Sequence, residues 1–181
     1  MKRLLILLMA ICLISGCASA AYKRSLNDLP EYDFSVEIPD GWYKPKYEKR
    51  YLITKEDKAT FLYVFIQQRP LDRSFKNTQK KLRNRMLPLE SAGLIIDEMS
   101  SDRRIMNFKV LENAPAIIDG HSGFKILFTH KNKAGFKYKT LYYGFISGNS
   151  FYNLRYSAGM PDYYNRGIED FNRILGSFKL K

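Results

Sequence analysis

The sequence predicts an α+β fold in which helices pack on a mostly antiparallel sheet. Stretches rich in β-branched and aromatic residues follow one another at hairpin spacing in the second half of the chain, and strands joined by hairpins are antiparallel. Three stretches with apolar residues at helical spacing flank this strand-rich half. The length suits one domain with its own core.

The first predicted strands come before the helices. Phe34, Val36 and Ile38 alternate with polar residues, which is typical of a half-buried strand over residues 34–38. Residues 50–54 are predicted as a second strand, and residues 60–68 are apolar on both faces, which indicates a central strand. Further strands are predicted at residues 107–112, 123–131, 136–146 and 150–158, with turns at residues 39–41, 132–135 and 148–149.

Each predicted helix has one apolar stripe. The first covers residues 71–86, the second begins at Pro88, and the third covers residues 161–175, with Pro161 near its start and Gly176 at its end. The three stripes are, in chain order, Leu71, Phe75, Leu82 and Met86; Leu89, Ala92, Ile96 and Met99; and Tyr164, Ile168, Phe171 and Leu175.

Four sequence stretches resemble one known domain family. FSVEIPDGW at residues 34–42, and the later order GFKILF, YYGFISGNSFYNLRYSA and FNRILGSFKL, resemble the opening and the ending of PsbP-like and Mog1-like domains. The resemblance covers residues 32–181 and implies an α/β/α sandwich around a central antiparallel sheet. Such domains serve as photosystem accessory subunits, transport factors and uncharacterised bacterial proteins, so the resemblance implies little about activity. It carries over no metal or binding residue.

The chain begins like an exported protein. Lys2 and Arg3 precede an apolar run over residues 4–14, which is far shorter than the ~20 residues that a membrane-spanning helix needs. Ile14-Ser15-Gly16-Cys17 then resembles the lipobox of bacterial lipoproteins. This resemblance implies that diacylglycerol is attached to the Cys17 thiol, that the chain is cut before Cys17, and that the new amine is usually acylated. An ordinary signal peptide cut at Ala18-Ser19-Ala20 is the alternative.

The lipobox divides the chain into a lipoprotein signal peptide at residues 1–16, a lipidated tether at residues 17–31 and the domain at residues 32–181. Ala18 follows the cysteine, which in a Gram-negative bacterium implies the outer membrane, facing the periplasm. The only other cysteine, Cys12, lies in the signal peptide, so the mature chain has no free thiol. This fits an oxidising compartment, and it excludes thiol catalysis and cysteine metal sites.

The charge of the chain is strongly positive, with a formal net charge of +12 at pH 7. Such a chain attracts polyanions. Export excludes nucleic acid as the partner, which leaves anionic lipid, lipopolysaccharide or an acidic envelope protein. The tyrosine-rich strands are accordingly interpreted as sheet packing.

The densest basic stretch falls in the first predicted helix and contains no acidic residue from Arg73 to Leu89. On a helix its cations lie opposite the apolar stripe, and two like-charged i,i+4 pairs are mildly destabilising. We therefore predict a partner-binding face formed by Arg73, Lys76, Lys80, Lys81, Arg83 and Arg85.

The candidates for catalysis are few. Asp119-Gly120-His121-Ser122 contains the residue types of a hydrolase triad, but neighbours on one tight turn do not form its hydrogen-bonded chain, so we expect a solvent-facing turn. His121 and His130 share a metal only if folding brings them together. The chain has no P-loop, G-x-G-x-x-G, EF-hand or HExxH motif.

We therefore expect a non-catalytic accessory or assembly-type envelope protein that uses no metal and no cofactor. The alternatives are a carrier of lipid or small ligands and an enzyme with a pocket near His121.

Overall fold

The computed structural model describes residues 32–45, 51–55, 61–160 and 162–181. The predicted signal peptide, the lipidation of Cys17 and the tether lie outside the described residues. The fold is that of the compact unit Asp33–Lys181. Among the described residues, no helix has the length and apolar character needed to cross a membrane.

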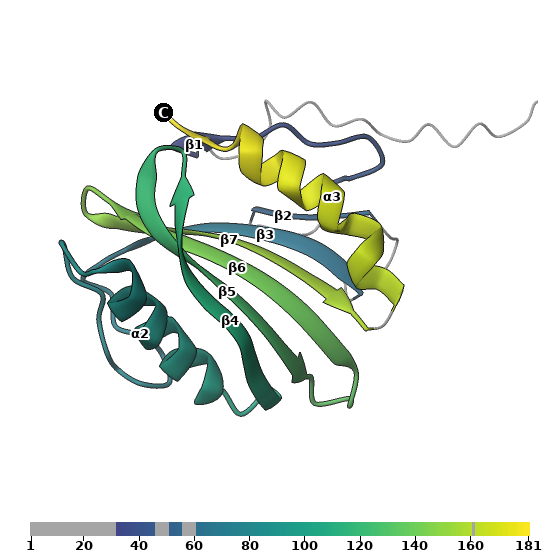
Figure 1. Ribbon diagram of the computed structural model, residues 1–181, viewed down its shortest axis with the longest axis horizontal. Coiled ribbons are helices and arrows are strands. Elements are labelled where there is room, and N and C mark those ends of the chain that lie inside the picture. Colours follow the sequence, from purple (N-terminus) through teal and green to yellow (C-terminus); the bar gives the residue numbers. More distant parts are fainter. Residues whose placement is uncertain (1–31, 46–50, 56–60, 161) are drawn as a thin grey trace, which may run out of the picture. The chain divides into compact units, whose positions relative to one another are not determined.

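The centre of the fold is a six-stranded antiparallel sheet with the order β2-β3-β7-β6-β5-β4 (Figure 1). The strand-rich half that the sequence predicts supplies four neighbouring strands of this sheet, joined by hairpins. The strands are β2 (Tyr51–Thr54), β3 (Leu62–Pro70), β4 (Met106–Ile118), β5 (His121–Lys131), β6 (Lys137–Ser147) and β7 (Ser150–Gly159). A separate two-stranded sheet joins β1 (Phe34–Ser35) to β8 (Lys179–Leu180).

Two helices cover opposite faces of the six-stranded sheet. Helix α2 (Pro88–Ser100) packs on β4 and β5, and helix α3 (Asp162–Ser177) packs on β7 and β3. Tyr142 of β6 belongs to the core under α2, whereas its neighbour Tyr143 contacts the Phe171 ring of α3 at 6.1 Å. Because successive residues of a strand point to opposite faces, the sheet lies between the two helices. The predicted α+β sandwich is therefore confirmed.

The α3 face is closed by aromatic packing. The ring of Phe171 stacks on that of Tyr156 at 5.4 Å, and the Tyr156 hydroxyl donates to the Tyr164 carbonyl at 2.7 Å. A Cβ on Gly167 would lie 2.9 Å from that hydroxyl, so glycine lets the helix approach the sheet. Tyr164 and Phe171 are buried as predicted.

Two further members of the predicted α3 stripe are placed differently. Ile168 and Leu175 are half-buried, and Ile174 takes the fully buried position instead. The helix also continues one residue past Gly176, to Ser177.

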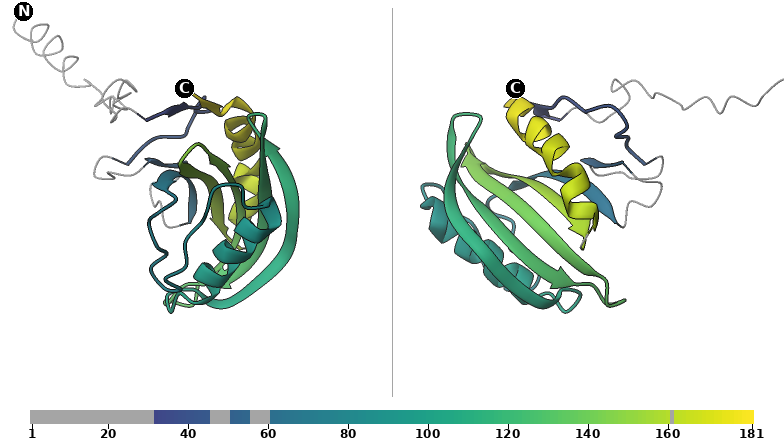
Figure 2. Two further views of the ribbon diagram at one scale, coloured as in Figure 1. Left: turned by 90° about the vertical axis from the view of Figure 1, so that its left-hand side faces the viewer. Right: turned by 45° about the vertical axis from the view of Figure 1, so that its right-hand side comes forward.

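The α2 face has a core in two parts. Phe124, Ile126 and Phe128 of β5 pack under α2, and Leu71, Phe75 and Leu82 extend the same cluster beyond the helix. Within α2, Ala92 is buried as predicted, but Leu89 is 47% exposed and Ile95 takes the buried position in its place. Figure 2 shows the long strand β4 bending round α2, and β4 carries register shifts between Met106 and Lys109 and between Val110 and Glu112.

The predicted helix over residues 71–86 is wrong. These residues form turns and irregular chain that cover the core with Leu71, Phe75 and Leu82. The three apolar residues anchor a loop as well as they would anchor a helix. The like-charged neighbours give the segment no helical support, and the N–H groups of Asn77 and Thr78 bond to the Glu98 carboxylate of α2 instead of to the preceding turn.

Two predicted strands differ in length from the observed ones. β1 ends at Ser35, because it pairs only with the short β8, so residues 36–38 are not strand. β4 continues past residue 112 to Ile118, where Asp119 (φ 47°) and Gly120 (φ 75°) form the tight turn into β5. Two central residues with positive φ are the mark of a type I′ hairpin, and Asp-Gly is its preferred sequence.

Candidate functional site

Residues 71–87, which we call the basic loop, run beside α2 on its face of the sheet. The loop is tied to the sheet where the Leu71 N–H donates to the Asn149 carbonyl at 3.1 Å. Its tip closes on itself, because the Phe75 N–H donates to the Lys80 carbonyl at 2.8 Å and the Gln79 N–H donates back to the Phe75 carbonyl at 3.1 Å. Leu71, Phe75 and Leu82 of the loop are buried, and its cations are exposed.

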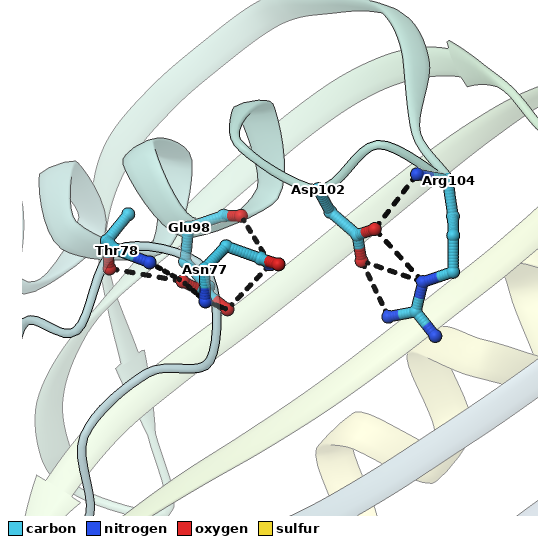
Figure 3. Close-up of polar contacts among 5 residues, drawn as sticks. All are labelled: Asn77, Thr78, Glu98, Asp102 and Arg104. Atoms are coloured by element: carbon cyan, nitrogen blue, oxygen red, sulfur yellow. Dashed lines mark hydrogen bonds and ion pairs between the residues drawn. The ribbon is translucent and has the colours of Figure 1, made fainter.

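Glu98, near the end of α2, holds the tip of the basic loop. Its carboxylate accepts hydrogen bonds from the Asn77 and Thr78 N–H groups at 3.0–3.1 Å, from the Thr78 hydroxyl at 3.1 Å and from the Asn77 side-chain amide at 2.9 Å (Figure 3). One carboxylate thus satisfies four donors of a segment that has no secondary structure of its own.

The six predicted partner-binding cations do not form a single face. Lys80 pairs with Asp97 at 2.7 Å, whereas Lys81 and Arg83 are exposed and make no ion pair among the described residues. Arg85 has a positive φ of 62° and lines a small cavity of about 150 Å³. Arg73 and Lys76 line a second, larger cavity.

The larger cavity, which we call the arginine pocket, has a volume of about 380 Å³. It lies where α2 no longer covers the sheet, between the basic loop, the end of α2 and strands β3, β6 and β7. Its lining holds five cations and two carboxylates: Arg69, Arg73, Lys76, Arg104 and Arg155, with Glu98 and Asp102. Strand pairing brings these residues together, because Arg155 faces both Phe65 on β3 and Tyr142 on β6.

The two histidines lie on opposite faces of the sheet. On the α3 side, His121 is half-buried, with Nδ1 2.9 Å from the Asp119 carbonyl oxygen and Nε2 3.2 Å from the Ser147 hydroxyl. His130 lies on the α2 side between the rings of Phe128 and Tyr138. Burial, assisted by the positive charge of Arg155, lowers the pKa of His130 to about 4.

The turn at Asp119 is a structural junction. Its carboxylate accepts the Lys179 ammonium at 2.7 Å and the Leu180 N–H at 3.0 Å, and the hydrogen bond from Lys179 lowers the pKa of Asp119. The carboxylate therefore ties β8 to the sheet, and the contact of His121 is with the backbone oxygen. The turn is less open to solvent than predicted, since His121 is half-buried, and neither cavity described above is lined by His121.

Sequence reasoning missed three residues of this region: Arg69, Glu98 and Arg155. Each is a single charged residue in an element predicted for other reasons, so no local motif marks it. A weak signal existed for Arg155. It stands between Leu154 and Tyr156 and interrupts a strand that is otherwise buried.

No protein-family model matches the chain, and no curated protein matches its sequence. Solved structures share its fold, among them the following two. LpqN of Mycobacterium tuberculosis, which is involved in cell envelope biogenesis, superposes with a TM-score of 0.60 at 11% identity, over 82% of this chain and 83% of LpqN. The cyanobacterial PsbP of Synechocystis superposes with a TM-score of 0.56 at 10% identity, over 82% of this chain and 87% of that protein. The chain has a PsbP-like fold.

Proposed function

We propose that this chain is a non-catalytic, lipid-anchored protein of the cell envelope that binds an anionic lipid surface through its basic loop. Three features support the proposal. The sequence carries a lipobox that ends at Cys17. The PsbP-like fold is shared with LpqN, a protein involved in cell envelope biogenesis. The basic loop presents exposed cations on an ordered backbone.

The order of the basic loop is the observation that carries the proposal. Glu98 and the buried side chains of Phe75 and Leu82 fix the backbone, so Lys81 and Arg83 project from a defined position without acidic partners among the described residues. Each cation close to an anionic membrane contributes about 1 kcal/mol to binding. A segment that only had to be soluble would normally mix glutamate with its lysines.

The proposed anchor makes this weak attraction effective. Cys17 and the folded unit are separated by about 15 residues, and such a tether, if flexible, reaches roughly 20 Å. The acyl chains would therefore hold the domain within a few screening lengths of the bilayer, since the Debye length is about 8 Å at physiological ionic strength. Tethering of this kind raises the effective concentration of the basic loop at the surface.

Vesicle co-sedimentation tests the proposal. The lipid-free chain of residues 18–181 should bind vesicles that contain phosphatidylglycerol, and binding should weaken as salt is raised. Lys81→Glu combined with Arg83→Glu should lower the affinity by about 30-fold or more, since at least two contributions of about 1 kcal/mol are lost. In cells, Cys17→Ser should remove the protein from the membrane fraction.

The matched control makes the same charge change elsewhere. Lys133→Glu with Lys137→Glu, two exposed residues at the β5–β6 hairpin, should cost clearly less affinity. Equal losses in the two double variants would show that net charge, and not the basic loop, drives binding. Absence of vesicle binding, together with crosslinking of the loop to an acidic envelope protein in intact cells, would replace the lipid surface with that protein.

A further inference from the structure

The arginine pocket is a second feature of the α2 face, distinct from the exposed cations of the basic loop. Its volume of about 380 Å³ lies within the range of small-molecule sites, which is roughly 300–1,000 Å³. Its floor is the sheet itself, at Tyr142, Phe151 and Asn153, all of which are at least 94% buried. The pocket is therefore built from the most regular part of the fold.

The carboxylates of the pocket are already in use. Glu98 is occupied by the donors of Asn77 and Thr78, and Asp102 accepts the Arg104 side chain at 2.6–3.2 Å (Figure 3). Neither is paired with Arg69, Arg73 or Arg155. Among the described residues these three arginines make no ion pair, so the pocket carries uncompensated positive charge.

Arg155 has an unsatisfied donor at the sheet surface. Its Nε is buried and has no hydrogen-bond partner among the described residues, and its guanidinium lies 5.1 Å from the Phe65 ring centroid and 5.9 Å from that of Tyr63. A buried donor without an acceptor is costly, and more so when it is charged. The position is interior to the sheet, where an apolar side chain would pack without this cost.

Tyr142 of β6 pairs with Arg155, and Arg69 lines the same pocket from four residues along β3 past Phe65, the partner of Arg155. The Arg69 guanidinium stacks over the Phe75 ring at 4.1 Å, and its burial lowers its pKa. Burial raises the pKa of Tyr142, opposed by the nearby charges of Arg155 and Arg69, so the phenol keeps its proton at neutral pH. Asn153 is 97% buried, yet its amide makes only long contacts of 3.4 and 3.5 Å to Gln67. One Arg69 N–H is taken by the Arg73 carbonyl at 2.5 Å, and the remaining donors of the floor have few acceptors.

We propose that the arginine pocket binds the phosphate group of a small phosphomonoester, with Arg69 and Arg155 as its guanidinium ligands and Tyr142 as a further donor. Guanidinium groups bind phosphate with paired N–H donors. A phosphomonoester carries close to two negative charges at pH 7 and three strong acceptor oxygens, which matches two arginines and a phenol better than a carboxylate does. This site goes beyond the proposed membrane surface and does not depend on it.

Calorimetric titration of the lipid-free chain of residues 18–181 tests the pocket. Inorganic phosphate and glycerol 3-phosphate are the probes, and acetate is the carboxylate comparator. The wild type should bind the phosphates more tightly than acetate. Arg155→Met and Arg69→Gln should each weaken phosphate binding by about 10- to 100-fold, because each removes a charge-assisted hydrogen-bonding group.

The control is Arg83→Gln, an exposed arginine of the basic loop outside the pocket, which should leave phosphate affinity unchanged. Arg155→Met replaces an unsatisfied donor with an apolar chain, so it should stay folded. Thermal unfolding checks this: at 100 times Kd, glycerol 3-phosphate should raise Tm by about 5–10 °C in the wild type and much less in Arg155→Met.

The outcomes separate the possible ligand sources and the two proposals. Tighter binding to phosphatidic acid vesicles than to glycerol 3-phosphate assigns the phosphate to a lipid, and the reverse assigns it to a soluble molecule. Three results would each overturn the inference. They are no phosphate binding by the wild type, phosphate binding by both arginine variants as tight as that of the wild type, and tighter binding of acetate than of phosphate by the wild type. Loss of phosphatidylglycerol binding in Lys81→Glu/Arg83→Glu, with phosphate binding intact, would keep the two sites distinct.

Discussion

The two faces of the sheet are built from the same strands but differ in how they are completed. On the α3 face, Tyr156, Phe171 and Phe178 form a closed aromatic core. On the α2 face, the helix packs mainly on β4 and β5, and the basic loop and the arginine pocket lie over β3 and β7. One face is therefore organised for stability, and the other leaves charged groups without partners, which is where a ligand has most to contribute.

The largest expected effect lies on the closed face. Phe171 is fully buried and stacks on Tyr156, so Phe171→Ala should lower the free energy of unfolding by about 3–5 kcal/mol through lost contacts and a cavity. Urea unfolding followed by circular dichroism measures this loss. On the other face, Arg155→Met should change the free energy of unfolding by less than about 1 kcal/mol. Similar losses of unfolding free energy in Phe171→Ala and Arg155→Met would mean that both faces of the sheet contribute equally to stability.

The next effect is acid sensitivity of the α2 face. His130 has a pKa of about 4 in the folded protein, below its usual 6.5, because burial and Arg155 disfavour the charged ring. The unfolded chain therefore binds more protons than the folded one between these values. Stability should fall as the pH drops from about 6.5 to 4, by about 2 kcal/mol once solvent screening of the partly exposed ring is allowed for.

The NMR signal of the His130 ring, followed as the pH is changed, measures the pKa of His130 in the folded protein. Arg155→Met removes the second cause and should raise the pKa of His130 part of the way toward 6.5. His130→Gln should flatten the dependence of the unfolding free energy on pH. If the ring titrates near 6.5 in the wild type, His130 is more accessible to water than its packing between Phe128 and Tyr138 implies.

The contrast between the two faces also explains which parts of the structure could be predicted from the sequence. The strands and both helices were predictable because each has a local period, of two residues or of about 3.6, that its own side chains carry. The turn at Asp119-Gly120 carries an equally local signal and was predicted as a turn, although the strand that leads into it was not. β4 was predicted too short because Pro115 and the residues around it break the alternation on an edge strand that bends.

The candidate site was less predictable, since tertiary contacts create it. Residues 71–86 have apolar spacing that fits a helix, and only the Glu98 carboxylate on another element decides for a loop. Arg69 and Arg155 are far apart in the chain, and the pairing of β3 with β7 brings both into the lining of one pocket. Among the predicted cations only Arg73 and Lys76 line the arginine pocket, and their sequence pattern does not distinguish them from Lys81 and Arg83.

The smallest expected effect concerns the hold of Glu98 on the basic loop. Glu98→Gln keeps the size of the side chain but replaces one acceptor oxygen with a donor, so some of the N–H groups of Asn77 and Thr78 lose their partner. The loop is near the surface, where water replaces part of this loss, and the free energy of unfolding should fall by about 1–2 kcal/mol. Trypsin should then cleave after Lys80 or Lys81 faster than in the wild type, because local opening exposes the chain.

Glu112→Gln, which removes an exposed pair with Lys125, is the matched control and should change neither the free energy of unfolding nor the rate of cleavage by much. Slow cleavage at the loop in Glu98→Gln would show that Phe75 and Leu82 alone order the basic loop. The arginine pocket would then owe its shape to the apolar core and not to the carboxylate on its rim.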